Sequence, residues 1–184
     1  MIRYFMMGRV ILFLLISTLT VGLYSQEKSA GPVIEGYGKV WDIDKPDYPT
    51  DTTQVFKAVF DIMQSPESPD MINPTIETVA RYLNMHARSG VPVEQIKAVM
   101  VIHNKASKDI MLPAAYQSKY GTENPNHPLL LELHKAGVQL IFCGQSSLSR
   151  DIPREEVMPE VEFALSAMTA LIQLQNKGYN LIKF

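Results

Sequence analysis

The feature that most constrains the fold is an alternation of strand-like and helix-like segments from residue 53 to the end of the chain. The strand-like segments are short and apolar at both odd and even positions, as is typical of strands buried on both faces. The helix-like segments repeat apolar residues every three to four positions and carry capping signals at their ends. The predicted strands are 54–63, 96–104, 138–143 and 179–184, and the predicted helices are 73–90, 128–136 and 159–178.

This alternation predicts an α/β fold in three layers, with helices on both faces of a mainly parallel sheet. Segment 108–121 is ambiguous, because Pro113 blurs the start of any helix there. Ligands of such sheets bind beyond the carboxyl ends of the strands. Cys143 and His103 each lie at the end of a predicted strand, so we expect both at that edge. In helix 159–178, one apolar side is expected to hold Val161, Ala164, Leu165, Met168, Leu171 and Ile172.

Residues 1–25 have the pattern of a secretory signal peptide, in which Arg3 and Arg9 precede an apolar stretch. This stretch falls short of the ~20 apolar residues that span a bilayer. We therefore expect cleavage after Ser25 and a periplasmic or secreted protein, with an uncleaved membrane anchor as the alternative. No cysteine near the end of the stretch offers a site for lipid attachment.

The rest of the chain divides into an irregular tail at 26–52 and one α/β domain at 53–184. Apolar segments after the signal peptide are too short to cross a membrane, so no membrane contact is expected after cleavage. The whole chain has a formal net charge of −2 and no basic run. This balance argues against nucleic acid as a partner.

The chain contains a single cysteine, Cys143, which excludes an internal disulfide. A free thiol has a pKa of ~8.5, so it becomes a good nucleophile only where its surroundings lower that pKa. Gly144, Gln145 and Ser146 directly follow Cys143, and their backbone is expected to supply N–H groups to a thiolate. The alternative is that Cys143 is a small buried hydrophobic residue without reactivity.

Polar residues lie at the end of the second predicted strand and directly after it. His103 is a candidate partner for Cys143, because it can stabilise a thiolate or move a proton near neutral pH. Asn104 and Lys105 come next and are candidate binding residues, and Lys105 would favour an anion. The alternatives are a histidine that caps a backbone carbonyl and a solvated lysine.

Several other chemistries lack their motifs. The histidines and Cys143 match no standard zinc spacing, so no metal is expected. Glycine-rich nucleotide motifs and the nucleophile elbow of hydrolases are absent as well, and no cofactor is expected. The sequence CGQSSLS has serines after its cysteine, but serines in such a loop are usually turn or cap residues.

Three stretches together resemble the DsrE/DsrF-like family of sulfur-relay proteins over residues 53–184: IKAVMVIHN, GVQLIFCGQSSLSRDI and ALSAMTALIQLQNKGYNLI. The resemblance implies a flavodoxin-like arrangement of the parallel sheet and assembly into trimers or hexamers. It also implies that Cys143 accepts sulfane sulfur as a persulfide, with His103 as the strand-end histidine of the family. Asp151 stands where the family often has glycine.

The leading hypothesis is therefore an exported sulfur carrier that exchanges sulfur with a separate donor and acceptor. This agrees with the residues, since a persulfide carrier needs one thiolate rather than a disulfide pair. Two alternatives remain. One is a small-ligand or partner-binding module with an inert cysteine, and the other is a thiol-dependent reductase or transferase.

Overall fold

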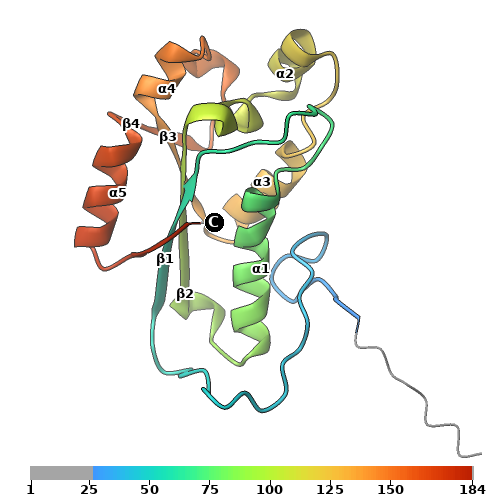
Figure 1. The fold of residues 1–184 in the computed structure, drawn as a ribbon, viewed down its shortest axis with the longest axis vertical. Helices are drawn as coiled ribbons and strands as arrows, with labels where there is room; N and C mark the ends of the chain where they lie inside the picture. Colours follow the sequence, from blue (N-terminus) through green and yellow to red (C-terminus); the bar gives the residue numbers. More distant parts are fainter. Residues whose placement is uncertain (1–26, 184) are drawn as a thin grey trace, which may run out of the picture.

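A computed structural model of the protein describes residues 27–183, so the predicted signal peptide at 1–25 lies outside the described residues. Within these described residues, five strands and five α-helices follow one another. Figure 1 shows their arrangement. The strands are β1 (Phe56–Ile62), β2 (Ile96–Ile102), β3 (Gln139–Cys143), β4 (Val161–Ala164) and β5 (Asn180–Ile182). The helices are α1 (Pro74–Arg88), α2 (Pro113–Tyr120), α3 (His127–Lys135), α4 (Gly144–Ser149) and α5 (Ala167–Asn176).

The strands form one all-parallel sheet in the order β4-β3-β2-β1-β5. Ile102 at the end of β2 pairs with Phe142 of β3, and Cys143 pairs with Ala164 of β4. Among the described residues no helix is long and apolar enough to cross a bilayer.

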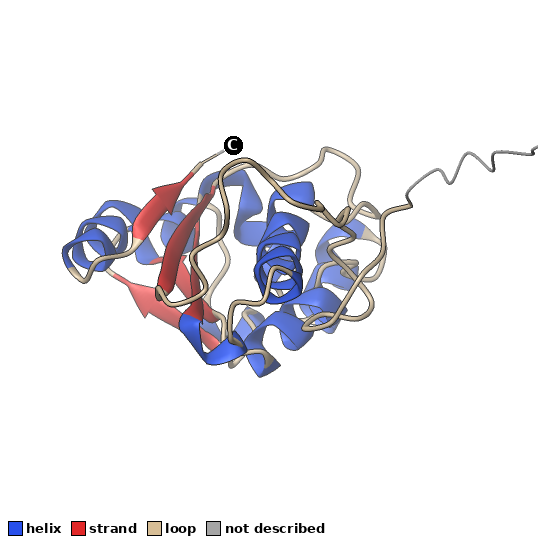
Figure 2. Ribbon diagram, turned by 90° about the horizontal axis from the view of Figure 1, so that it is seen from below, coloured by secondary structure: helices blue, strands red, loops and turns tan. Residues whose placement is uncertain are grey.

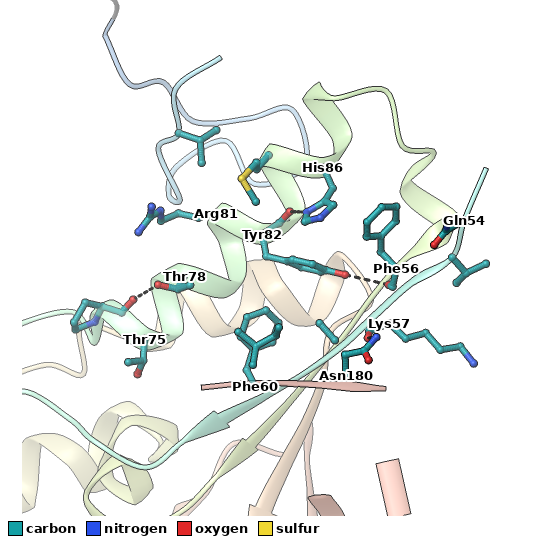
Figure 3. Close-up of a pocket in the computed structure, with 16 residues that line it drawn as sticks. Gln54, Phe56, Lys57, Phe60, Thr75, Thr78, Arg81, Tyr82, His86 and Asn180 are labelled. Carbon is teal, nitrogen blue, oxygen red and sulfur yellow. Dashed lines mark hydrogen bonds between the residues drawn. The ribbon is translucent and has the colours of Figure 1, made fainter. Parts of the chain in front are cut away.

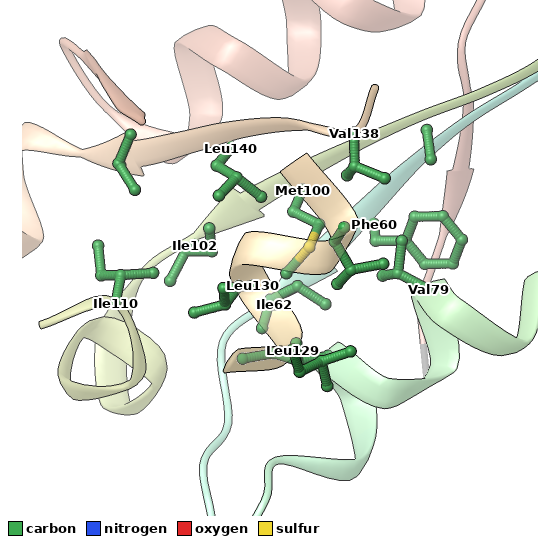
Figure 4. Packing of buried hydrophobic residues seen from close by; sticks show 14 of the residues in the cluster. Phe60, Ile62, Val79, Met100, Ile102, Ile110, Leu129, Leu130, Val138 and Leu140 are labelled. Atoms are coloured by element: carbon green, nitrogen blue, oxygen red, sulfur yellow. The ribbon is translucent and has the colours of Figure 1, made fainter. Parts of the chain in front are cut away.

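Helices cover both faces of the sheet, as the sequence predicts (Figure 2). On one face, α1 and α3 pack over side chains such as Phe60, Met100 and Leu140, which form the larger core (Figure 4). On the other face, α5 packs over a smaller cluster that includes Val59, Val101 and Cys143. The predicted three-layer α/β/α class is confirmed.

Helix α1 shows why these elements form where they do. The side chain of Asn73 caps its first turn by accepting a hydrogen bond from the backbone of Thr75, and Pro74 occupies the first helical position. Its buried residues follow the 3.6-residue period, so one face meets the core. The predicted first, second, third and closing strands and this helix are found within two residues of the expected ends.

The predicted long helix at 159–178 is wrong, because this segment forms strand β4 and then the shorter helix α5. β4 adds to the free edge of β3, and Ser166 starts α5 by accepting a hydrogen bond from Thr169 N. The residues of the expected apolar side therefore do not share one buried face: Val161 of β4 is buried, but three others are not. These three, Leu165, Met168 and Ile172, are 72%, 73% and 59% exposed, whereas the side of α5 facing the sheet buries Ala167, Ala170 and Leu174.

The ambiguous segment 108–121 contains the end of one short helix and the whole of another. A 3-10 helix, Asn104–Ile110, follows β2 directly, and a bridge between Met111 and Val157 separates it from α2. Pro113 is the first residue of α2, a position where its missing N–H costs nothing.

Residues 27–52 contain no helix or strand, but they are held against α1. The buried side chain of Asn84 accepts hydrogen bonds from the N–H groups of Val33 and Ile34, and it donates to the carbonyls of Ile34, Tyr37 and Gly38. Gly38 has φ +69°, and a Cβ there would lie 2.5 Å from the Ala80 carbonyl carbon. Only glycine allows this close approach of the tail to the helix.

Candidate functional site

Cys143 is the last residue of β3 and lies at the carboxyl edge of the sheet. Its neighbour on β2 follows from the strand register. Ile102 pairs with Phe142. His103 directly follows β2 and Cys143 directly follows Phe142, so the two residues occupy corresponding positions. Side chains alternate along a strand, so both residues are on the face that α5 covers. The structure thus brings the two predicted residues to one place on the sheet.

The thiol of Cys143 is surrounded by hydrogen-bond donors in a buried site, and the residue is 4% exposed. Burial raises the pKa of the Cys143 thiol, but hydrogen bonds from the Ser146 hydroxyl and from the N–H groups of Ser146, Ala167 and Gln145 outweigh it. The pKa is therefore lowered below its ordinary value. These groups come from the start of α4 and from the start of α5, so the sulfur lies where two helices begin near one strand end.

Ser146 is fixed from behind by the loop after β2. The backbone N–H of Asn104 donates to the Ser146 hydroxyl oxygen at 3.0 Å, which leaves the hydroxyl proton for the sulfur. Asn104 takes the left-handed conformation, with φ +54°, and its side chain accepts a hydrogen bond from Arg150. Asn104 thus acts on the thiol through Ser146, which is a role that sequence alone did not assign to it.

Gly144 lets the chain turn from β3 into α4 close to the neighbouring strand. A Cβ at this position would lie 2.9 Å from the carbonyl oxygen of Ala164. A larger residue would therefore push α4 away from β4, and with it the N–H groups that face Cys143. Gln145 is exposed and contributes its backbone N–H to the sulfur.

His103 hydrogen-bonds Asp61 rather than Cys143. Its Nε2 lies 2.7 Å from Oδ1 of Asp61, whose Oδ2 lies 3.1 Å from Nζ of Lys183. No hydrogen bond between His103 and Cys143 appears among residues 27–183. The carboxylate orients the imidazole, so His103 lies beside the position of Cys143 in a hydrogen-bonded group with Asp61 and Lys183.

Asp61 and Ala167 are two site residues that sequence reasoning missed. Asp61 had a detectable signal, because it is an acidic residue near the end of an otherwise apolar strand. Ala167 N had none, because the sequence suggested that it lay inside one long helix, where its N–H would be used by the helix itself.

Asp151 also takes the left-handed conformation, with φ +52°. Glycine adopts this conformation without a steric penalty, and aspartate tolerates it better than most residues do. The loop after α4 can therefore keep the backbone path that glycine at this position would take.

A cavity of ≈ 410 Å³ opens beside Asn104. Its lining includes three cationic side chains, Lys105, Lys108 and Arg150, against one acidic one, Glu67. The predicted binding residues Asn104 and Lys105 thus line a cavity whose charge favours anions. Within the described part of the chain, no group of three or more His, Cys, Asp or Glu residues could hold a metal ion.

A model of the DsrE/DsrF-like family matches residues 57–184. Among solved structures, the protein of unknown function MTH1491 from Methanobacterium thermoautotrophicum is similar, with a TM-score of 0.51 and 16% identity over 70% of this chain and 99% of that one. The ychN protein from E. coli is similar with a TM-score of 0.51 and 14% identity, over 70% of this chain and 99% of that one. At these identities the two structures show a shared fold. A comparison with curated proteins gives no significant match.

Proposed function

The chain belongs to the DsrE/DsrF-like family, and on this premise we propose that it carries sulfane sulfur on Cys143, as a persulfide, in the cell envelope. The observation that carries the proposal is the set of donors around the sulfur. Three backbone N–H groups and one hydroxyl lower the pKa of the only cysteine in the chain. A thiolate is the form that attacks sulfane sulfur.

Loading is a transfer between sulfur atoms without net oxidation. The Cys143 thiolate attacks the outer sulfur of a donor hydropersulfide, R–S–SH, and the S–S bond breaks. The bonding electron pair leaves with R–S⁻, and Cys143 becomes Cys–S–SH. Release is the same step in reverse direction, in which an acceptor thiolate takes the outer sulfur and Cys143 returns to the thiolate. The protein is then a carrier rather than a turnover enzyme, and donor and acceptor are other molecules.

The neighbouring residues have separate roles in this proposal. Ser146 and the N–H groups stabilise the thiolate before loading and again after release. His103, oriented by Asp61 at 2.7 Å, adjusts the charge near the sulfur without holding it. The cations of the cavity beside Asn104, including Lys105, attract anionic sulfur species to this edge of the sheet.

Assembly into a trimer or hexamer is part of the same proposal. Leu148 on α4 and three residues of the α5 region, Leu165, Met168 and Ile172, are all exposed. These large apolar side chains flank the elements that hold Cys143, and a contact between copies would cover them. Sedimentation of the purified protein tests this assembly, and a monomer at micromolar concentration would exclude it.

Sulfur loading is tested by treating the folded protein with polysulfide and measuring intact mass. The wild-type protein is expected to gain sulfur that dithiothreitol removes. Cys143→Ser should abolish loading and leave the fold intact, and a variant that still loads would refute the carrier function. His103→Ala should slow loading without abolishing it, and unchanged kinetics would remove His103 from the mechanism.

A second candidate function is a binding module in which Cys143 is inert, and the 4% exposure of this residue favours it. In that case no sulfur is gained while the cavity beside Asn104 still binds a ligand. A thiol-dependent reductase or transferase would instead consume its substrate in repeated turnovers. Sulfur gain limited to one equivalent per chain, without turnover, distinguishes the carrier from both.

A further inference from the structure

A cavity lies away from Cys143, between α1 and the edge of the sheet formed by β1 and β5 (Figure 3). Its volume is ≈ 760 Å³, within the range of pockets that hold small molecules. Ala58 and Phe60 of β1 and Ile182 of β5 face it from the sheet. Cys143 packs on the opposite face, beneath α5, so this cavity is separate from the sulfur site.

The cavity exists because of how the chain reaches β5. The connection from β4 crosses the sheet through α5, on the face opposite to α1. Within residues 27–183, no helix is therefore left to cover β5 on the α1 side. The opening is a consequence of the topology, and its walls are the side of α1 and the face of β1 and β5 that no helix covers.

Aromatic rings form one wall of the cavity. The ring centroids of Phe56 and His86 are 4.7 Å apart, those of Tyr82 and His86 are 4.4 Å apart, and those of Phe60 and Tyr82 are 5.4 Å apart. Such a cluster presents a broad and rigid apolar surface. Burying an apolar chain or ring against it removes that surface from water, which is the main source of affinity in pockets of this kind.

Three polar side chains of the cavity lining, Tyr82, His86 and Thr78, already form hydrogen bonds within α1 or to β1. Tyr82 donates its hydroxyl proton to the carbonyl of Phe56 at 3.0 Å, and Nδ1 of His86 lies 2.8 Å from the Tyr82 carbonyl. Thr78 donates to the Pro74 carbonyl at 2.9 Å, as Figure 3 also shows. The interior of the cavity therefore favours an apolar ligand body over a sugar or a nucleotide, which would need more free partners.

The charges around the cavity have one sign. Its lining contains Lys57 and Arg81, and none of the described residues that line it is acidic. Lys57 is engaged elsewhere, since its Nζ donates to the Lys177 carbonyl and lies over the ring of Tyr179. Arg81 has no hydrogen-bond or ion-pair partner in the described part of the chain. Its guanidinium is free to bind a carboxylate in bidentate geometry.

We propose that this cavity binds an amphipathic carboxylate, with its apolar chain against the rings of Phe56, Phe60 and Tyr82 and its carboxylate on Arg81. Among the described residues that line the cavity, the apolar wall, the polar side chains that are already hydrogen-bonded and the one unpaired cation, Arg81, together define this class of ligand. The cavity does not contain Cys143, so the proposal does not depend on whether Cys143 carries sulfur.

Decanoate is the probe, and 1-decanol is the uncharged control of the same chain length. Calorimetric titration of the purified protein should show that decanoate binds at one site per chain. Decanol should bind at the same site more weakly. Arg81→Gln should weaken decanoate binding about tenfold, the value of one charge-assisted hydrogen bond, and leave decanol unchanged. Lys97→Gln removes an exposed cation outside the cavity and should have no effect. Cys143→Ser should have none either.

Thr78 of α1 lines the cavity, so Thr78→Trp should fill it and abolish binding of both probes, while circular dichroism shows that the helix content is kept. The proposal is wrong if decanoate does not bind, or if Arg81→Gln and Lys97→Gln affect it equally. It is also wrong if the protein is an oligomer that Thr78→Trp dissociates, because the cavity is then a contact between two copies.

Discussion

Asp109→Asn is expected to change how the stability of the protein depends on pH, because this carboxyl is fully buried and forms a hydrogen-bonded network at the carboxyl edge of the sheet. Its oxygens accept hydrogen bonds from Ser65 at 2.8 Å, Asn73 at 2.7 Å and Asn126 at 3.3 Å. These partners belong to the loops before α1 and α3, so the network ties together the loops at this end of the sheet. Desolvation by burial nevertheless dominates and raises the pKa of Asp109 from 3.8 to about 6.

The sign and size of the effect follow from this shift. Between pH 3.8 and about 6 the folded state holds a proton that the unfolded state has lost, so stability falls as pH rises. A shift of this size corresponds to about 3 kcal/mol of lost stability near pH 7. An amide at position 109 can accept from Asn73 and donate to Ser65, but it loses the contact from Asn126, at a cost of about 1 kcal/mol. The variant should be more stable near pH 7 by about 2 kcal/mol and less stable near pH 4.

Urea unfolding of the wild-type protein and of Asp109→Asn at a series of pH values measures both effects. The matched control is Asp47→Asn, an exposed carboxylate, which should leave the pH dependence of the wild type unchanged. If the free energy of unfolding depends on pH in the same way for the wild type and for Asp109→Asn, the prediction is wrong, because Asp109 would then titrate alike in the folded and unfolded states.

Three further substitutions test local features of the structure. Gly144→Ala places a methyl group against the Ala164 carbonyl at the end of β4, so it should destabilise the fold by about 2 kcal/mol in thermal unfolding. An unchanged stability would mean that α4 can move away without cost. Asn84→Ala leaves buried backbone groups of residues 27–52 without partners, so it should lower the free energy of unfolding by about 3 kcal/mol and speed proteolysis of that segment. Unchanged proteolysis would contradict the anchoring role of Asn84. Asp151→Gly removes a side chain from a left-handed position and should stabilise the protein by about 0.5 kcal/mol, and a loss of stability would show that the aspartate side chain is used.

The sequence predicted the fold class and the edge of the sheet where Cys143 and His103 lie, because buried parallel strands leave a strong apolar signal. Their positions on neighbouring strands follow from the strand register, which depends on which strand pairs with which. The interaction of His103 with Asp61 was not predicted, since the two residues are 42 positions apart and meet only through strand pairing.

The division of 159–178 into a strand and a helix could not be predicted for a different reason. Val161–Ala164 is a four-residue edge strand, and its apolar residues also fit the period of the helix that follows. The pairing with β3 decides between them, and no local signal reports it. Because β4 was not predicted, the start of α5 was not predicted either, and the N–H of Ala167 was not expected beside the thiol.

The most direct test of the central claim is the alkylation rate of Cys143 by iodoacetamide as a function of pH, measured on the folded protein by intact mass. Burial lowers the absolute rate, but the pH at which the rate levels off reports the thiolate. The account predicts a plateau below pH ~8.5, the pKa of a free thiol, and a plateau at higher pH for Ser146→Ala, which removes the hydroxyl donor. A rate near zero until the protein is denatured would contradict the account and leave Cys143 as a packed, inert residue.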